Sequence, residues 1–350
     1  MDIKIDFAEL LHSRKFQYAL VTVVIAAVLP VFVRGGHLIV NFFPMLLILA
    51  IYASSWNLLA YSGQGSLGHA AFLGIGGFAS ALSAVSLGVP PLIGLFVGAI
   101  ISAIIGLLIG LACVRLKAWF LGMVTFGFAI IIGTIFSQFD SVFHGVDGFA
   151  TPSIVPQGVP FYYFTLAMAV ASIAAIFWVM KSKWGLAFKA IHENESEAKM
   201  VGINTWKYKL LAFVISTFFA GLAGGLFAES QLFIQLNIFS IDNSFMPLIM
   251  SVIGGLGTIE GPIIGSIIIY SYEYFMPSAY PFLQFLNPIF PGVSNVGPYL
   301  MFAGEGLFLI LVVIFLPKGI SSLWSRLYKL LRKFYDYLFE ESKSNKAKKK

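Results

Sequence analysis

The sequence predicts an all-α protein that crosses a membrane many times, and three features support this fold class. Hydrophobic residues make up 59% of the 350 residues and only 11% are charged, whereas a soluble domain carries about 25% charged residues. Mean hydropathy is correspondingly high, at +0.89. No Asp, Glu, Lys or Arg occurs between Arg34 and Arg115, an interval far longer than the roughly 20 apolar residues that one helical crossing requires.

Turn-forming residues and charges divide the chain into about eight to ten expected helices. Their approximate ranges are 16–33, 37–59, 67–86, 91–113, 118–137, 161–180, 209–228, 244–257, 261–276 and 298–316. The first range is longer than a signal-peptide core and no small-residue cleavage site follows it, so we expect it to be retained. The helices form one expected membrane domain, residues 16–320, between an N-terminal segment, 1–15, and a C-terminal tail, 321–350.

The basic residues predict the orientation of these helices. All but one of the 22 Lys and Arg residues lie before the first helix, at 115–117, at 181–209, or after residue 316. Since basic residues accumulate on the cytoplasmic side of a membrane, we expect these clusters and both termini to be cytoplasmic. The exception is Arg34, which falls on the opposite side. An even number of expected helices separates successive clusters, which agrees with this topology.

Two of the expected helices are weak, and glycines interrupt both of them. The range 67–86 is rich in glycine, while 244–257 is short and ends in a glycine-rich string. Paired interrupted segments of this kind indicate the substrate pathway of a transporter. Residues 63–67 and 255–259 share the pattern G-x-G-[ST]-[LI], which is too short to decide whether the chain contains an internal duplication. The candidate pathway residues are Gly63, Gln64, Gly65, Ser66, Gly68, His69, Gly254, Gly255, Gly257, Thr258 and Glu260.

The longest polar segment between expected helices, 181–209, is predicted to contain a short amphipathic helix over about 186–202. Apolar residues recur at helical spacing along one side, and they are Leu186, Ala187, Ala190, Ile191, Ala198 and Val201. The opposite side carries the i,i+4 pairs Lys189–Glu193 and Glu195–Lys199. Gly202 suits the end of this helix, and Asn204 or Thr205 suits the N-cap of the next one.

Two interpretations of this amphipathic helix remain open. It lies on lipid headgroups, or it docks a soluble partner that acts on the membrane domain. In the second case we expect the contact to involve Leu186, Ala190, Ile191, Glu193, Asn194, Glu195, Ala198 and Gly202. The C-terminal tail has its own apolar stripe opposite a basic face, and for the tail we expect binding to anionic membrane lipid.

Several kinds of chemistry are excluded by what the sequence lacks. No G-x-x-x-x-G-K-[ST] loop occurs, so any ATP must be bound by a partner protein. Cys113 is the only cysteine, which excludes a disulfide within the chain and a thiolate metal cluster. Ser66 and His69 do not make a serine hydrolase, because Gln64 stands where the G-x-S-x-G pattern requires glycine. The basic residues lie in loops and at chain ends, so nucleic-acid binding is not expected.

Among the carboxylates within or beside expected membrane helices, two are singled out as functional candidates. Glu260 follows the second glycine string, and Glu305 lies inside the last expected helix. A carboxylate in the centre of a membrane helix costs about 2.5–3.5 kcal/mol and is a functional candidate for that reason. For Glu260, a position in a turn at the cytoplasmic surface is the alternative. For Glu305, a helix–helix contact or protonation is the alternative.

Five segments together resemble the permeases of branched-chain amino-acid ABC transporters. They are the string SGQGSLGHAAF at 62–72, the run GLAFKAIHENE at 185–195 with Met200–Asn204, the stretch 209–225, the turn 254–262, and the closing Pro317-Lys318-Gly319. They occur in the order of the family from about residue 40 to residue 320. The long loop at 181–209 and the run at 115–120 are similar to the LivM-like member of the family.

The resemblance implies a type II ABC-importer-like permease in the cytoplasmic (inner) membrane, with no enzymatic activity, cofactor or metal of its own. Its implied partners are a sister permease, two cytoplasmic ABC ATPases and an extracytoplasmic substrate-binding protein. The implied substrates are branched-chain or related hydrophobic amino acids. Permeases for urea and short amides share much of the pattern. An ion-coupled secondary transporter, driven through Glu260 or Glu305, is the alternative class, and co-purification of ATPases in mild detergent distinguishes the two.

Overall fold

The computed structural model describes residues 14–32, 36, 38–116, 118–143, 147–276, 297–317 and 319–322. Nearly all of the expected N-terminal segment and of the C-terminal tail lies outside the described residues. The side chain of Glu305 also lies outside them, so its expected role is not addressed by the structure.

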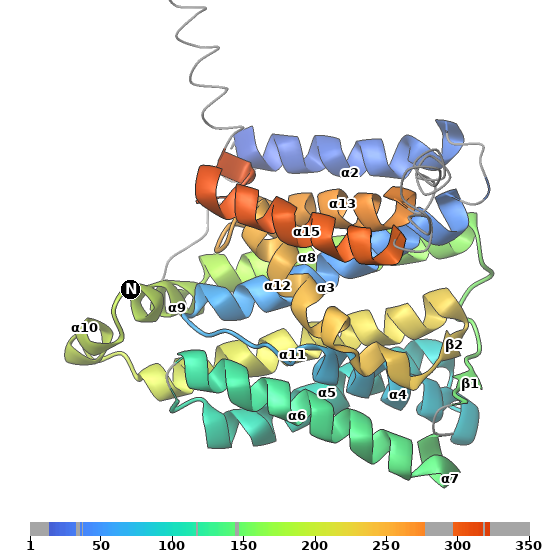
Figure 1. Ribbon diagram of the computed structural model, residues 1–350, viewed down its shortest axis with the longest axis horizontal. Helices are drawn as coiled ribbons and strands as arrows, with labels where there is room; N and C mark the ends of the chain where they lie inside the picture. Colours follow the sequence, from blue (N-terminus) through green and yellow to red (C-terminus); the bar gives the residue numbers. More distant parts are fainter. Residues whose placement is uncertain are drawn as a thin grey trace, which may run out of the picture.

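Each of the ten expected crossings contains a helix, which confirms the all-α fold class (Figure 1). The helices are α2 (Arg14–Phe32), α3 (Phe43–Tyr61, preceded by the π-helical turn η1, Leu38–Phe42), α4 (Ala70–Ser86), α5 (Pro91–Cys113), α6 (Ala118–Gln138), α8 (Val159–Lys181), α11 (Thr205–Gln231), α12 (Ile241–Gly254), α13 (Glu260–Phe275) and α15 (Gly297–Phe315). Among the described residues, five segments are long and apolar enough to cross a membrane, namely Leu38–Tyr61, Pro91–Cys113, Trp119–Gln138, Val159–Lys181 and Thr205–Gln231.

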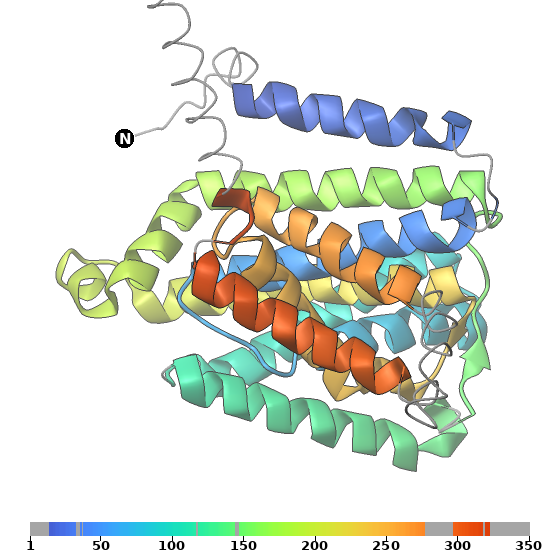
Figure 2. The ribbon, with the colours of Figure 1, turned by 45° about the horizontal axis from the view of Figure 1, so that its top comes forward.

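The long helices run side by side, so the bundle has two ends (Figures 1 and 2). At one end, called the α9 end, lie α9 (Lys183–Glu193) and α10 (Glu195–Met200). At the other, called the strand end, lie α7 (Asp140–Phe143), β1 (Phe149–Ala150), β2 (Phe233–Ile234) and the 3-10 turn η2 (Leu236–Phe239). The two strands pair antiparallel, with Phe149 opposite Ile234. This short ladder holds the loop before α8 against the loop after α11.

The interior is built on α4, α5 and α11, whose backbones approach closely at glycines. A methyl group at Gly224 of α11 would overlap the Leu73 carbonyl of α4, and one at Gly98 of α5 would overlap the Gly76 carbonyl. Ser102 reinforces the three-helix contact, because its hydroxyl lies 3.0 Å from the Phe72 carbonyl and 2.9 Å from the Thr217 carbonyl. Small residues and interhelical hydrogen bonds are the means by which helices associate in lipid.

The peripheral helices α2, α5, α6 and α15 expose large apolar side chains over their outer faces. Examples are Ile25, Leu108, Trp119 and Ile314, which are 60%, 57%, 77% and 65% exposed. On a soluble protein, apolar surface of this extent would promote aggregation. It suits a bundle whose sides contact lipid and whose backbone hydrogen bonds are satisfied inside its helices.

Candidate functional site

The first glycine string is not helical, and it forms an interrupted segment (residues 62–69) between α3 and α4. After α3 ends at Tyr61, the chain turns at Gly63, which has a φ of +75°, and runs back from the α9 end toward the middle of the bundle (Figures 1 and 2). The expected crossing 67–86 is therefore helical only from Ala70. In membranes, irregular backbone of this kind occurs where protein covers it or where it lines a cavity.

Contacts with α3 fix the depth that the interrupted segment reaches. Trp56 Nε1 donates a hydrogen bond of 2.7 Å to the Ser66 carbonyl. The His69 ring stacks on Tyr52, with 5.4 Å between the ring centroids. Since Tyr52 and Trp56 lie in the second half of α3, the segment retraces about two turns of that helix. On its other side, Gly68 packs so closely against α6 that a methyl group would overlap the Thr125 carbonyl.

Three buried side chains of the interrupted segment carry polar atoms without a hydrogen-bond partner. They are Gln64 Oε1, Ser66 Oγ and His69 Nδ1, and among the described residues only Ser54 Oγ and Trp206 Nε1 share this property. Buried polar groups in proteins are nearly always paired, so each exception calls for an explanation. A segment that contacts polar groups of a passing substrate would need such atoms.

The hydrogen bonds of Ser55 determine which nitrogen of His69 carries the proton. The Ser55 hydroxyl donates to the Tyr52 carbonyl at 2.7 Å and lies 3.0 Å from His69 Nε2. A serine has one hydroxyl hydrogen, so Nε2 must be the donor to Ser55. In the neutral imidazole, Nδ1 is then a free acceptor in the middle of the bundle.

The second glycine string forms the turn between α12 and α13 at the α9 end. Gly255 and Gly257 have φ values of +131° and +70°, which side chains other than glycine rarely adopt. A methyl group at Gly254 would overlap the Gly261 carbonyl, so the two helices meet backbone to backbone. Thr258 closes the turn by donating to the Gly255 carbonyl at 2.8 Å. Glu260 is exposed at the first residue of α13.

Neighbouring residues of α3 hold the two glycine strings. Trp56 binds the first string at Ser66, as described above. Asn57 binds the second: its Nδ2 donates to the Thr258 carbonyl at 2.7 Å, and its Oδ1 accepts from the Gly257 amide at 2.8 Å. Successive residues of a helix point about 100° apart, so the strings flank the same end of α3 on different sides.

The loop 181–209 contains two helices, α9 and α10, where the sequence predicted one over 186–202. Asn194 causes the break. Its backbone is extended, and its side chain caps α10 by accepting hydrogen bonds from the Ser196 amide at 3.0 Å and the Glu197 amide at 3.3 Å. The capping role predicted for Asn204 is confirmed, because its side chain accepts from the Lys207 amide at 3.1 Å.

The break changes which side chains of this α9–α10 unit face the bundle. Gly185, Ala187, Phe188, Ile191 and Ala198 are buried. Of the predicted apolar stripe, Leu186 and Val201 are 56% and 77% exposed and Ala190 is half-buried, whereas Ala187, Ile191 and Ala198 face the bundle and are not free to contact a partner. Trp184 and Met200 are exposed as well. Four large apolar side chains of the unit thus remain available at the end of the bundle, and we call them the apolar surface of the unit.

Charged residues join the α9–α10 unit to the start of α11. The expected pairs are confirmed, with Lys189 Nζ 3.8 Å from Glu193 and Lys199 Nζ 2.9 Å from Glu195. Glu195 also binds the buried ammonium of Lys209. Partial burial alone would raise the pKa of the Glu195 carboxyl, but its hydrogen bonds with Lys209 and Lys199 and their positive charges lower that pKa to about 2. The carboxylate is therefore ionised at every physiological pH.

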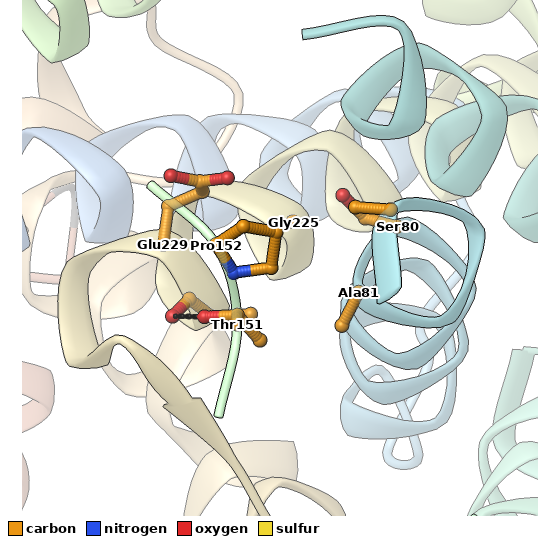
Figure 3. Close-up of a pocket in the computed structure, with 8 residues that line it drawn as sticks. Ser80, Ala81, Thr151, Pro152, Gly225 and Glu229 are labelled. Carbon is orange, nitrogen blue, oxygen red and sulfur yellow. Dashed lines mark hydrogen bonds between the residues drawn. The ribbon is translucent and has the colours of Figure 1, made fainter. Parts of the chain in front are cut away.

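A buried carboxylate lies near the strand end. Glu229 of α11 faces a crevice that also borders Ser80 and Thr151 (Figure 3). Its Oε2 accepts a hydrogen bond of 2.9 Å from the Ile154 amide, and its carbonyl accepts one of 3.1 Å from Gln157 Nε2. Thr151 donates to the Ala228 carbonyl at 3.0 Å. These contacts fasten the loop between β1 and α8 to the end of α11.

Sequence patterns did not identify Trp56, Asn57, Lys209 or Glu229 as important residues. A lysine four residues after a helix start and a glutamate near the end of an apolar helix are weak signals, although both are costly to bury unpaired. Among the described residues, no group of three or more His, Cys, Asp or Glu lies close enough to hold a metal ion. What this arrangement offers is a polar segment inside an apolar bundle.

The fold is that of an all-α, multi-pass membrane protein. The family of permease components of branched-chain amino acid transport systems matches residues 38–315. The chain belongs to this family. That range includes both glycine strings and the α9–α10 unit.

Individual relatives show modest identity to the chain. It is 26% identical to the high-affinity branched-chain amino acid permease LivM of Salmonella typhimurium, over 72% of this chain and 66% of the relative. It is 30% identical to the probable branched-chain amino acid permease LivH of Methanocaldococcus jannaschii, over 48% and 50%. The guanosine ABC transporter permease NupQ of Bacillus subtilis is 34% identical over 19% and 22%. The chain thus spans less than two-thirds of the length of each relative, and no solved structure matches it.

Proposed function

We propose that this chain is the permease subunit of an ATP-driven importer for branched-chain or related hydrophobic amino acids. The observation that carries the proposal is the α9–α10 unit, which presents an apolar surface at one end of the bundle and is connected through Lys209 of α11 to the interrupted segment inside it. A permease that receives force from a separate ATPase requires this combination. Family membership supports the same class of function.

The basic residues support a cytoplasmic position for the α9 end. Arg115 and the six lysines of 181–209 lie at this end, in the connections or in the adjoining helix ends, as expected under the positive-inside rule. Both termini would then be cytoplasmic, and the strand end, with Glu229 and its loop, would face the side from which substrate arrives. A substrate-binding protein would dock at the strand end, two ABC ATPases at the α9 end, and a sister permease against a side of the bundle.

In this proposal the chain performs no covalent chemistry. ATP binding by the partner shifts an equilibrium between two arrangements of the bundle, and the α9–α10 unit is the rigid element that transmits the shift. The acceptors Gln64 Oε1, Ser66 Oγ and His69 Nδ1 are buried in the arrangement described here, and in the other arrangement they would offer hydrogen bonds to a substrate ammonium group along the interrupted segment. The surrounding apolar side chains suit an aliphatic substrate, and most of the selection is left to the binding protein.

The direct test is uptake by the reconstituted complex. Purification in mild detergent is expected to retain two ATPases and a second permease with this chain. Proteoliposomes that contain the complex, the binding protein and internal ATP should accumulate labelled leucine, isoleucine or valine, and a non-hydrolysable ATP analogue should stop accumulation. If labelled urea or guanosine is taken up instead in parallel assays, the chain is still an importer permease, but its substrate differs from the one proposed.

An ion-coupled transporter is the second candidate, and the buried carboxylate of Glu229 is the observation that favours it. Secondary transporters also use interrupted helices, and intramembrane carboxylates often carry their coupling protons. The α9–α10 unit argues against this candidate, because a carrier that works without a partner ATPase does not need a docking surface. Dependence of uptake on an ion gradient in the absence of partner subunits would favour the carrier.

A further inference from the structure

Lys209 is a buried cation near the start of α11, and one carboxylate of the α9–α10 unit binds it. Its Nζ contacts Glu195 Oε2. Glu195 Oε1 lies 2.9 Å from Lys199 Nζ and accepts a hydrogen bond of 3.2 Å from Thr205 Oγ1. Thr205 and Lys209 are four residues apart and share one face of α11. Glu195 therefore fastens the first turn of α10 to the first two turns of α11.

Lys209 also contacts the interrupted segment, through its backbone. Its carbonyl accepts a hydrogen bond of 2.9 Å from Nε2 of Gln64, which is itself buried and also donates to Ser62 Oγ at 2.8 Å. One residue earlier, Gly63 lies so near α9 that a methyl group there would be 3.1 Å from the His192 Cα. The interrupted segment thus meets α9 and α11 at the place where α10 is fastened.

Stability alone does not account for an ion pair at this place. The Lys209 ammonium is buried while the Glu195 side chain is 38% exposed, so desolvation of the ammonium offsets much of its attraction to the carboxylate, and apolar packing of similar volume would be about as stable. The ion pair restricts the position of α10 relative to α11, because few arrangements of the two helices keep the Lys209 ammonium paired. A link of this kind resists sliding between the two helices, whereas an apolar contact can repack.

We propose that Lys209 is a positioning residue for transport, which with Glu195 and Gln64 links the α9–α10 unit to the interrupted segment. A displacement of α10 by a docked ATPase is passed to the start of α11 through the ion pair. From there the Lys209 carbonyl passes it to Gln64, and hence to the segment that carries Ser66 and His69. This inference rests on the proposed function, because it requires a partner that moves the α9–α10 unit.

The test compares transport with ATP hydrolysis in the full reconstituted complex. In Lys209→Met the side chain keeps its apolar stem and loses its charge, and in Glu195→Gln the carboxylate becomes an amide. For both we expect ATP hydrolysis to continue while the uptake per ATP hydrolysed falls about tenfold, within the usual range of coupling between sites. Lys207→Met is the matched control, since Lys207 is exposed on the same helix two residues away, and it should keep the wild-type ratio.

A double variant separates positioning from a merely structural role. Glu195→Gln leaves the buried Lys209 ammonium without its charged partner, which destabilises the fold, whereas in Lys209→Met the partly exposed Glu195 keeps its contact with Lys199. Glu195→Gln with Lys209→Met removes both charges, so the thermal stability of the complex should return toward the wild-type value. We expect the uptake per ATP to remain low in the double variant. Recovery of that ratio together with stability would overturn the proposal, because the pair would then serve the fold alone.

The outcomes also distinguish this inference from the proposed function. If the wild-type complex shows no ATP-driven uptake, the proposed function itself is wrong. If the wild type transports and Lys209→Met keeps the wild-type ratio of uptake to hydrolysis, only the positioning role is wrong. Gln64→Leu, which removes the hydrogen bond to the Lys209 carbonyl, should lower the same ratio, and a normal ratio would exclude Gln64 from the link.

Discussion

Individual residues of the interrupted segment differ sharply in what surrounds them. Gly65 and Gly68 belong to one string, but their packing differs. A methyl group at Gly65 would meet nothing within 4 Å, while one at Gly68 would overlap the backbone of Thr125 in α6. His69, one residue later, combines a paired Nε2 with an unpaired Nδ1. Neighbouring positions are therefore predicted to respond differently to small substitutions.

Gly68→Ala is expected to abolish most of the uptake, and Gly65→Ala to retain it. The added methyl at Gly68 must displace the segment or α6, at a cost of about 1–3 kcal/mol typical of overpacking. At Gly65 the effect on stability should be within about 0.5 kcal/mol. Thermal unfolding of each purified variant, together with leucine uptake, checks the pair. Equal effects at the two positions would contradict the packing described for Gly68.

His69→Phe tests whether the free Nδ1 acceptor serves transport. Phenylalanine keeps an aromatic ring against Tyr52 and loses one hydrogen bond to Ser55, so the folding cost should be about 1 kcal/mol. We expect the variant to assemble and to hydrolyse ATP but to lose uptake. Wild-type uptake by this variant would show that His69 fills space in the core and makes no contact with substrate.

At the level of elements, the helices follow from the sequence and the contacts between them do not. Long apolar stretches bounded by charges were sufficient to predict the ten helices, because hydrogen bonding inside a helix is the solution available to a chain in lipid. The break at Asn194 was missed because asparagine is also tolerated on the polar face of a helix. The hydrogen bonds of Asn57 to Gly257 and Thr258 join residues about 200 positions apart, and no local pattern marks them.

Exposed residues of the α9–α10 unit test docking more directly than its buried residues do. Leu186→Asp and Met200→Asp place a charge on the apolar surface of the unit, so we expect normal amounts of folded protein, loss of the bound ATPase and loss of uptake. Ile191→Asp is the contrasting variant. Ile191 is buried against the bundle, and an unpaired charge there should destabilise the fold by about 3–5 kcal/mol.

Pull-down of the ATPases and the yield of folded permease distinguish these variants. Normal retention of the ATPases by both exposed-site variants would place the docking surface elsewhere. The alternative of a unit lying on lipid headgroups would then be favoured.

The ion pair between Glu195 and Lys209 predicts how the stability of this element depends on pH. The folded-state pKa of Glu195 is lowered to about 2, below the ordinary value of about 4.3 in the unfolded chain. Its contribution to stability is therefore complete above about pH 5 and is lost as the pH falls toward 2. The difference in unfolding temperature between wild type and Glu195→Gln should be constant from pH 6 to 9 and shrink below pH 4. A difference that disappears near pH 7 would contradict the ion pair.

In the molecule as a whole, the two ends of the bundle carry different groups of residues. The α9 end carries the basic residues, the apolar surface of the α9–α10 unit and the link through Lys209. The strand end carries Glu229 and the loop that it fastens. Between them the interrupted segment brings Ser66 and His69 to the middle of the bundle. The sequence predicted the two glycine strings as parts of one pathway, and in the structure both are bound to α3, on different sides of it.

Determining which source of energy drives uptake is the most direct test of whether the chain is an ATP-driven permease. In an ATP-driven importer, no carboxylate of this chain has to change its protonation state during the cycle. Glu229→Gln, Glu260→Gln and Glu305→Gln should therefore each retain substantial uptake. In Glu229→Gln the amide oxygen can still accept the hydrogen bond from the Ile154 amide.

The deciding measurement is uptake of labelled leucine into sealed vesicles that contain the full complex. Proton and sodium gradients are collapsed with ionophores, and ATP is supplied inside. We predict that accumulation continues under these conditions, that it stops when ATP is removed, and that the three glutamine variants behave in the same way. Accumulation that follows an imposed ion gradient, ignores ATP and is lost in Glu229→Gln would contradict an ATP-driven permease and identify an ion-coupled carrier.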